Sequence, residues 1–241
     1  MSFASRLIPF KLRKSIFKLL STRSLWLSQA GQDFWVSGEA FNGKRGGYFL
    51  DIGAHDGITI SNTFILERKY AWKGICVEAN PSSFSLLLKN REAKCLNICL
   101  DSKNGEVEFA LGDKLSGIVS SDTDNPDTSD FPKIRLQTRV INDILAEHNA
   151  PSVIDYLSID VEGAEDRVLS GLDWKAYRFN CVTIERPSQG LRAKFSDEGY
   201  VLVKDLPGLD AFFVHKEFIP TFQENCYGFW NSTRIFGFRW S

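Results

Sequence analysis

The sequence predicts an α/β fold with a doubly wound, mainly parallel seven-stranded sheet that ends in an antiparallel hairpin. From residue 47 onward, short apolar runs alternate with helical patterns, which is typical of a parallel sheet covered on both faces. The last two apolar runs, 200–204 and 211–215, are joined by a segment containing Pro207 and Gly208, which favours a hairpin. A chain of 241 residues is long enough to bury a core around such a sheet.

The individual elements follow from local patterns. Residues 47–52 (GYFLDI) form a predicted strand because they are apolar and end at a glycine-containing turn. Residues 81–90 form a predicted helix, with Asn80 as its N-cap and Pro81 in the first position, where the missing N–H costs nothing. By the same criteria of periodicity and length, we expect further strands at 74–78, 96–100, 156–160 and 181–185. An apolar run at 106–111 either extends the sheet or forms a hairpin. Helices are expected at 60–70, 140–148 and 165–169.

Composition narrows the class of protein. The net charge of −1 gives no bias toward nucleic acid. Five cysteines without a C-x-x-C pair are expected to be free thiols in a reducing cytoplasm. No apolar stretch approaches the roughly 20 residues of a membrane span, and the N-terminus does not resemble a signal peptide, so we expect a cytoplasmic protein.

Residues 1–28 differ from the rest of the chain. They contain six basic residues and no acidic one, and Leu12, Ile16, Leu19 and Leu20 fall at helical spacing. This predicts a basic amphipathic N-terminal extension ahead of a domain at 29–241. Two interpretations remain open: peripheral docking on an anionic membrane surface, or a helix packed on the domain or frayed at the terminus.

The strongest functional signal is Asp51-Ile52-Gly53-Ala54-His55-Asp56-Gly57, directly after a predicted strand. Ligands of doubly wound folds bind beyond the carboxyl ends of the strands, and Gly53 and Gly57 allow a sharp turn close to a ligand. The motif is not G-x-G-x-x-G and lacks a Walker lysine, which disfavours a dehydrogenase or a phosphate-binding loop. An acid at a strand end suits a cationic ligand.

Acids also end the later strands. Glu78 is placed to accept hydrogen bonds from ribose hydroxyls. Asp160 and Glu162 are placed to position a substrate hydroxyl and act as general base. With Glu185 they could also hold a divalent cation, although we do not expect a metal. His55 is a weaker candidate for a catalytic base than these acids.

Five stretches carry a family resemblance: residues 28–33 (SQAGQD), 49–57 (FLDIGAHDG), 72–81 (WKGICVEANP), 154–165 (IDYLSIDVEGAE) and 182–185 (VTIE). In order and spacing they resemble the FkbM family of S-adenosylmethionine-dependent methyltransferases. The resemblance implies a Rossmann-like class I methyltransferase domain over 29–241 that transfers a methyl group to a hydroxyl of a sugar, glycan or secondary metabolite. The alternative is a catalytically inactive, membrane-associated binding protein with the same fold.

The resemblance also implies roles for particular residues. Asp160 and Glu162 would be catalytic and face the transferring methyl group and the acceptor. The residues that would contact the cofactor are Gln32, Asp33, Asp51, Gly53, Ala54, His55, Gly57, Glu78, Ala79, Asn80, Asp101 and Asp160. The acceptor pocket is expected to involve the loop 113–130 and the aromatic tail, unless that tail forms a buried cluster; the tail contains Phe222, Tyr227, Phe229, Trp230, Phe236, Phe238 and Trp240.

Overall fold

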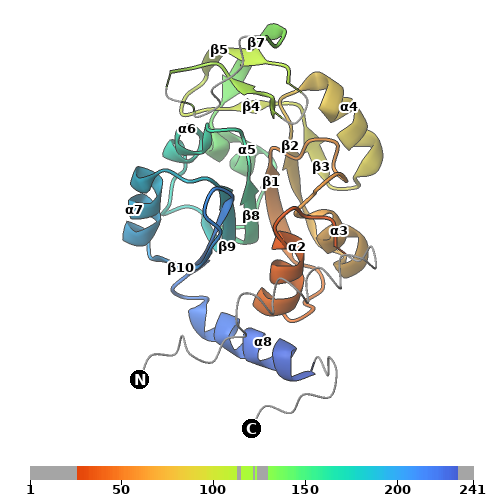
Figure 1. The fold of residues 1–241 in the computed structure, drawn as a ribbon, viewed down its shortest axis with the longest axis vertical. Coiled ribbons are helices and arrows are strands. Elements are labelled where there is room, and N and C mark those ends of the chain that lie inside the picture. The colour runs from red at the N-terminus through yellow and green to blue at the C-terminus, as the bar shows by residue number, and fades with distance from the viewer. Residues whose placement is uncertain (1–25, 113–114, 122, 124–129, 233–241) are drawn as a thin grey trace.

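Seven strands form one sheet in the order β10-β11-β9-β8-β1-β2-β3 (Figure 1). The computed structural model describes residues 26–112, 115–121, 123 and 130–232. Neighbouring strands are parallel, except that β11 runs antiparallel to β9 and to β10. The predicted mainly parallel seven-stranded sheet with a C-terminal antiparallel hairpin is therefore confirmed. The strands are β1 Tyr48–Ile52, β2 Lys73–Val77, β3 Lys94–Leu96, β8 Val153–Ile159, β9 Arg178–Glu185, β10 Tyr200–Asp205 and β11 Asp210–His215.

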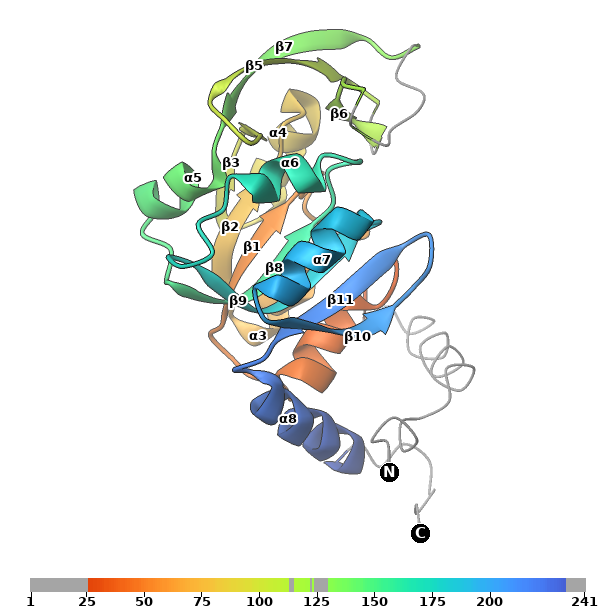
Figure 2. The same cartoon turned by 90° about the vertical axis from the view of Figure 1, so that its left-hand side faces the viewer.

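Helices cover both faces of this sheet. Helices α5, α6 and α7 lie on one face (Figure 2), where their apolar side chains share a core with the sheet. The π-helix η2 and helices α3 and α4 contribute to a second core on the other face. The helices are α2 Gln32–Phe34, η2 Trp35–Ala40, α3 Phe64–Tyr70, α4 Pro81–Asn90, α5 Ile141–Glu147, α6 Glu165–Ser170, α7 Gln189–Asp197 and α8 Ile219–Ser232.

The start of α4 follows the sequence prediction. The side chain of Asn80 accepts a hydrogen bond from the backbone N–H of Ser82 at 2.9 Å, and Pro81 occupies the first helical position. Helix α7 was not predicted, although Ser188 caps it in the same way by accepting from the N–H of Leu191 at 3.0 Å. The helix expected at 60–70 begins only at Phe64, because Ile60 has a left-handed backbone with φ of 52°.

The predicted strand at 96–100 is wrong as a single element. Leu96 ends β3 in the large sheet, whereas Cys99–Leu100 form β4 in a separate four-stranded sheet of order β4-β7-β5-β6. The chain leaves the large sheet at Asn97, whose side-chain amide donates to the carbonyls of Glu78 at 2.8 Å and Ala79 at 3.1 Å. The other strands of the small sheet are β5 Gly105–Ala110, β6 Gly117–Ile118 and β7 Lys133–Arg139.

The small sheet settles the open question about residues 106–111. They do not extend the large sheet. Strand β5 instead pairs antiparallel with β6 and with β7, and β7 itself was not predicted. The small sheet and α8 lie at opposite ends of the molecule (Figure 1). Of the predicted N-terminal extension, residues 1–25 lie outside the described part of the chain. Within that part, no helix is long and apolar enough to cross a membrane.

Candidate active site

The loop after β1 is held against the loop after β8. Gly53 has φ of 85°, and a Cβ atom built there would stand 1.7 Å from the carbonyl oxygen of Asp160. Only glycine fits this close backbone approach at a positive φ. Gly57 also has a positive φ, of 81°, and its Cβ would meet Leu87 and Arg91 at 2.7 Å. Both glycines are therefore required by packing, and Gly53 brings the ends of β1 and β8 together.

Glu78 follows β2 and fixes the shape of this loop. Its side chain is buried, its Oε2 accepts from the backbone N–H of His55 at 2.8 Å, and its Oε1 accepts from the N–H of Asn80 at 2.7 Å. Burial raises the pKa of Glu78, while the two backbone hydrogen bonds and His55 oppose that rise. Each carboxylate oxygen can accept a second hydrogen bond. Glu78 is therefore a preorganised acceptor for a ligand that carries hydroxyl groups.

Asp51 belongs to a buried network beneath the loop. It accepts a hydrogen bond from the hydroxyl of Thr63 and lies 3.8 Å from the guanidinium of Arg91. The side chain of Arg91 is fully buried and pairs with Glu67 at 2.9 Å. Burial raises the pKa of Asp51, and the charge of Arg91 and the bond from Thr63 oppose that rise. Asp51 thus holds the loop to the helices behind it.

Three carboxylates meet where β8 and β9 end. One oxygen each from Asp160, Glu162 and Glu185 lies within 4.8 Å of the others, a spacing that could hold a metal ion. Burial, followed by the charge of Glu185, its hydrogen bond and the charge of Glu162, raises the pKa of Asp160 well above its usual range. The guanidinium of Arg186 contacts Glu162 at 3.0 Å and Glu185 at 3.2 Å. We call these four residues the acidic corner.

Backbone strain accompanies the acidic corner. Glu162 has φ of 54° and Arg186 has φ of 38°, values in the left-handed region that side chains other than glycine rarely adopt. The N–H of Arg186 donates to the carbonyl of Leu209 at 2.7 Å, which ties it to the β10–β11 turn. Such strained positions concentrate at functional sites.

A cleft of about 460 Å³ joins these features. It lies beyond the carboxyl ends of β1, β2, β8 and β9, where doubly wound folds bind ligands. The sequence-predicted residues that line it are Asp51, Gly53, Ala54, His55, Glu78, Ala79, Asp160, Glu162 and Glu185.

Five other predicted cofactor residues are not among those that line the cleft. Gln32 donates to Asp210 at 2.6 Å, and Asp33 is buried where it accepts from the hydroxyl and N–H of Ser28 and the N–H of Leu27. Both stabilise the entry into α2.

The other three residues also have structural contacts. Gly57 packs on α4, and Asn80 caps that helix. Asp101 accepts from Arg167 at 2.7 and 2.9 Å; burial raises its pKa, but the bonds from Arg167 outweigh this and lower it.

Several cleft residues were missed by sequence reasoning. Residues 59–62 contribute one wall, where Asn62 donates to Ser158 at 2.9 Å. The small sheet contributes Phe109, which was also missed, whereas Ser116 and Ile118 line the cleft from within residues 113–130, the segment expected to shape the acceptor pocket. No motif marks these positions, because they reach the cleft through long-range folding. The alternating pattern of 133–139 (KIRLQTR) could have revealed β7, and with it the small sheet.

The aromatic tail packs away from this cleft. Phe222 contacts Trp35 with ring centroids 6.0 Å apart, and Phe229 contacts Phe34 at 5.5 Å. These side chains take the buried-cluster alternative and do not line the acceptor pocket, because α8 packs on η2 at the other end of the molecule. Tyr227 is 75% exposed. The structure does not describe Phe236, Phe238, Trp240, the Trp230 side chain, or residues 113, 114, 122 and 124–129 of the loop 113–130.

Comparisons with known proteins place the chain among methyltransferases. A family model described as the methyltransferase FkbM domain matches residues 51–202. No curated protein matches the sequence. Among solved structures, the methyltransferase FkbM from Methylobacillus flagellatus KT is similar, with 13% identity, a TM-score of 0.45, and coverage of 74% of this chain and 47% of that one. This chain thus spans about half the length of that protein.

Two further solved structures are similar at the same level. A TehB-like SAM-dependent methyltransferase from Corynebacterium glutamicum ATCC 13032 Kitasato has 11% identity and a TM-score of 0.42, with coverage of 87% of this chain and 100% of that one. The METTL16 MTase domain has 12% identity and a TM-score of 0.45, with coverage of 76% and 65%.

Proposed function

The chain belongs to the FkbM methyltransferase family, and from this premise we propose that it transfers a methyl group from S-adenosylmethionine to a hydroxyl of a sugar, glycan or secondary metabolite. Carbohydrate and metabolite hydroxyls fit the acidic corner, because carboxylates accept hydrogen bonds from hydroxyl groups. The observation that carries the proposal is the buried carboxylate of Glu78, which the backbone N–H groups of His55 and Asn80 hold at the cleft.

The order of the strands supports this cofactor. Along the sheet edge the acidic corner follows β9 and β8, Glu78 follows β2, and the apolar wall lies toward β3 and the small sheet. S-adenosylmethionine carries a positive sulfur and ammonium group at one end and an adenine ring at the other, with ribose between them. The acids would therefore hold the cationic end, and Glu78 would accept hydrogen bonds from the ribose. The apolar wall for the adenine is formed by Ile98, Leu100, Phe109 and Ile118.

The residues of the acidic corner have different proposed roles toward the acceptor hydroxyl. S-adenosylmethionine supplies an activated methyl group when bound. Asp160 would take or hold the proton of the acceptor hydroxyl, because a carboxylate whose pKa is raised by burial and by neighbouring acids is a stronger base than an ordinary aspartate. Glu162, held by Arg186, would orient the hydroxyl. Holding both reactants in the cleft would supply most of the rate enhancement.

A divalent metal bound by Asp160, Glu162 and Glu185 is the less favoured version of this mechanism. Arg186 already places a positive charge on two of these carboxylates, which reduces the need for a second cation. Activity measured with a chelator separates the two versions. Undiminished turnover with chelator excludes the metal. Loss of turnover with chelator, followed by recovery when Mg²⁺ is added, establishes it.

The alternative function, an inactive membrane-associated binding protein, depends on residues 1–28. Most of that segment lies outside the described residues, and the acids expected of an active enzyme are all present in the cleft, which favours the enzyme. Pelleting with anionic liposomes, with and without residues 1–28, tests the membrane contact. Equal pelleting of both forms removes it.

Cofactor binding provides the first test of the proposal. Isothermal titration calorimetry with S-adenosylmethionine should show saturable binding that Glu78→Gln weakens at least about 10-fold, the cost of losing a charge-assisted hydrogen bond. The matched control is Glu106→Gln, the same substitution on the outer face of β5, where Glu106 pairs with Arg135. Equal weakening by both variants, or none by Glu78→Gln, contradicts the proposed ribose contact.

The acceptor requires a product assay. Mass spectrometry with isotopically labelled S-adenosylmethionine, on candidate glycans and secondary metabolites with free hydroxyls, should detect a labelled O-methyl product. Asp160→Asn should abolish the product while cofactor binding remains measurable. A labelled N-methyl product instead would overturn the proposed acceptor chemistry without affecting the cofactor assignment.

A further inference from the structure

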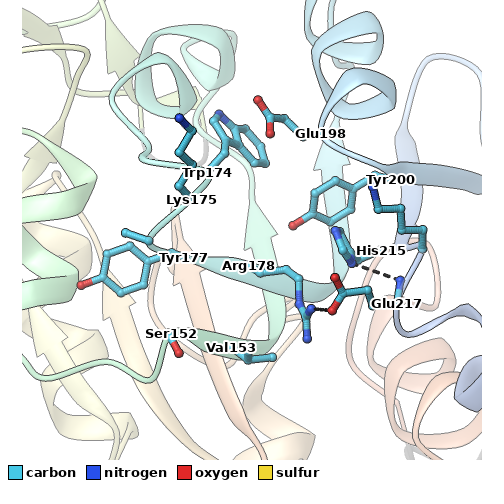
Figure 3. Close-up of a pocket in the computed structure, with 12 residues that line it drawn as sticks. Ser152, Val153, Trp174, Lys175, Tyr177, Arg178, Glu198, Tyr200, His215 and Glu217 are labelled. Carbon is cyan, nitrogen blue, oxygen red and sulfur yellow. Dashed lines mark hydrogen bonds and ion pairs between the residues drawn. The ribbon is translucent and has the colours of Figure 1, made fainter.

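A second cavity lies at the edge of the sheet opposite the cleft. It has a volume of about 340 Å³ and is formed where β8 and β9 begin and β11 ends (Figure 3). The cleft lies beyond the other ends of β8 and β9, so the two share no lining residue. The proposed methyl transfer therefore makes no use of this second cavity.

Arg178 is the central polar group of the cavity. Its Nη1 pairs with the carboxylate of Glu217, drawn as a dashed line in Figure 3. Its Nε is buried and has no hydrogen-bond partner among the residues that the structure describes. A buried donor without an acceptor costs free energy that a bound oxygen atom would recover. The Arg178 guanidinium therefore has hydrogen-bonding capacity that its ion pair with Glu217 does not use.

The charge around Arg178 favours a negative ligand. Three basic residues line the cavity, Lys175, Arg178 and Lys216, against the two acids Glu198 and Glu217. Glu198 is already paired with Lys194 at 2.6 Å. Burial, followed by the charges of Arg178 and Lys216, lowers the pKa of His215 at the same cavity, so His215 adds no positive charge near neutral pH. The cavity therefore carries a net positive charge.

Aromatic rings form the remaining walls. Trp174 packs edge-on against Tyr200, with ring centroids 5.9 Å apart. Figure 3 shows Tyr177 and Tyr200 on either side of Arg178. The hydroxyl of Tyr200 accepts from the N–H of Phe179 at 3.0 Å, which leaves its own proton to donate. Aromatic walls next to a cationic group suit a ring that carries an acidic substituent.

We propose that this cavity is a second binding site, for a small molecule that bears an oxyanion, phosphate or carboxylate, on a planar ring. The oxyanion takes the place of the Glu217 carboxylate on the Arg178 guanidinium, and the ring packs against the aromatic walls. Glu217 competes with the ligand for the same guanidinium. Because the Glu217 side chain is 60% exposed, it can turn into solvent without disturbing the core.

Calorimetric titration of the full-length protein with phenyl phosphate, benzoate and inorganic phosphate tests this site. The ring-bearing probes should bind more tightly than inorganic phosphate, and the stronger of the two identifies the preferred oxyanion. Arg178→Gln should weaken binding at least about 10-fold, whereas Glu217→Gln should strengthen it about 3-fold or more because a competing carboxylate is removed. Arg135→Gln, the same change at an exposed ion pair on β7, should leave binding unchanged.

Opposite effects at Arg178 and Glu217 are the decisive result. Glu217 is largely exposed, so Glu217→Gln remains informative even if Arg178→Gln fails to fold. No binding of any probe up to about 10 mM, corresponding to less than about 3 kcal/mol, would overturn the proposal, as would unchanged or weaker binding by Glu217→Gln. Glu78→Gln should not alter the affinity for these probes, so failure of the proposed methyl transfer is distinguishable from failure of this site.

Discussion

Glu165, at the start of α6, is expected to make the free energy of unfolding depend on pH. It is buried, and its Oε1 accepts from the N–H of Val161 at 3.0 Å and of Gly163 at 3.4 Å. Burial raises its pKa from the usual 4.5 to about 7, against the effect of these hydrogen bonds. The folded state therefore retains a proton that the unfolded state has lost between these two pH values.

The direction and size of the effect follow by linkage. An acid with a raised pKa in the folded state contributes stability that is complete below pH 4.5 and is lost as the pH rises through about 7. At roughly 1.4 kcal/mol for each tenfold change in proton affinity, the loss is about 3 kcal/mol. Glu165→Gln keeps an oxygen acceptor but no longer titrates. From pH 4.5 to pH 8 its free energy of unfolding should therefore rise by about 3 kcal/mol relative to wild type.

Denaturant unfolding, followed by tryptophan fluorescence at several pH values, measures this difference. Comparing the two proteins at each pH removes the contribution of the other titrating groups, which both share. A matched control is Glu224→Gln, the same change on an exposed side chain of α8, which should run parallel to wild type. Parallel profiles for Glu165→Gln, within about 0.5 kcal/mol, would refute the linkage.

Two further substitutions test the packing behind the cleft. Gly53→Ala places a Cβ against the carbonyl of Asp160 at a positive φ, so it should lower the free energy of unfolding by roughly 2 kcal/mol or more, measured by denaturant titration; full stability would contradict the close approach. Arg91→Met leaves Glu67 buried without its partner and should cost about 3–5 kcal/mol in the same assay. Arg68→Met, which removes an exposed ion pair, should cost less than about 1 kcal/mol, and equal losses would show that burial of the Arg91 pair is unimportant.

Local signals predicted the large sheet well. Strands buried on both faces are mainly apolar, and β1, β2, β8 and β9 each contain such a continuous apolar run. The Asn80-Pro81 pair fixed the start of α4 because capping is a property of adjacent residues. The small sheet was harder to predict, because β5 and β7 are partly exposed and carry Lys, Arg and Glu, so they lack the continuous apolar runs that mark the strands of the large sheet.

The site was predictable where residues follow strands. Asp51, Glu78 and Asp160 reach the cleft because parallel strands end at one edge. Asp101 also follows a short strand, but Cys99–Leu100 belong to the small sheet, so Asp101 pairs with Arg167. Asn62 enters the cleft from a loop whose path depends on tertiary contacts, which no local pattern encodes.

Strand β9 connects the two cavities. It begins at Arg178 and ends at Glu185, eight residues that extend roughly 3.3 Å each, so its ends lie about 23 Å apart. A molecule bound at one end therefore leaves the other end sterically open. The two proposed ligands would therefore not compete for space, and any influence of one on the other would be transmitted by the protein and not by direct contact.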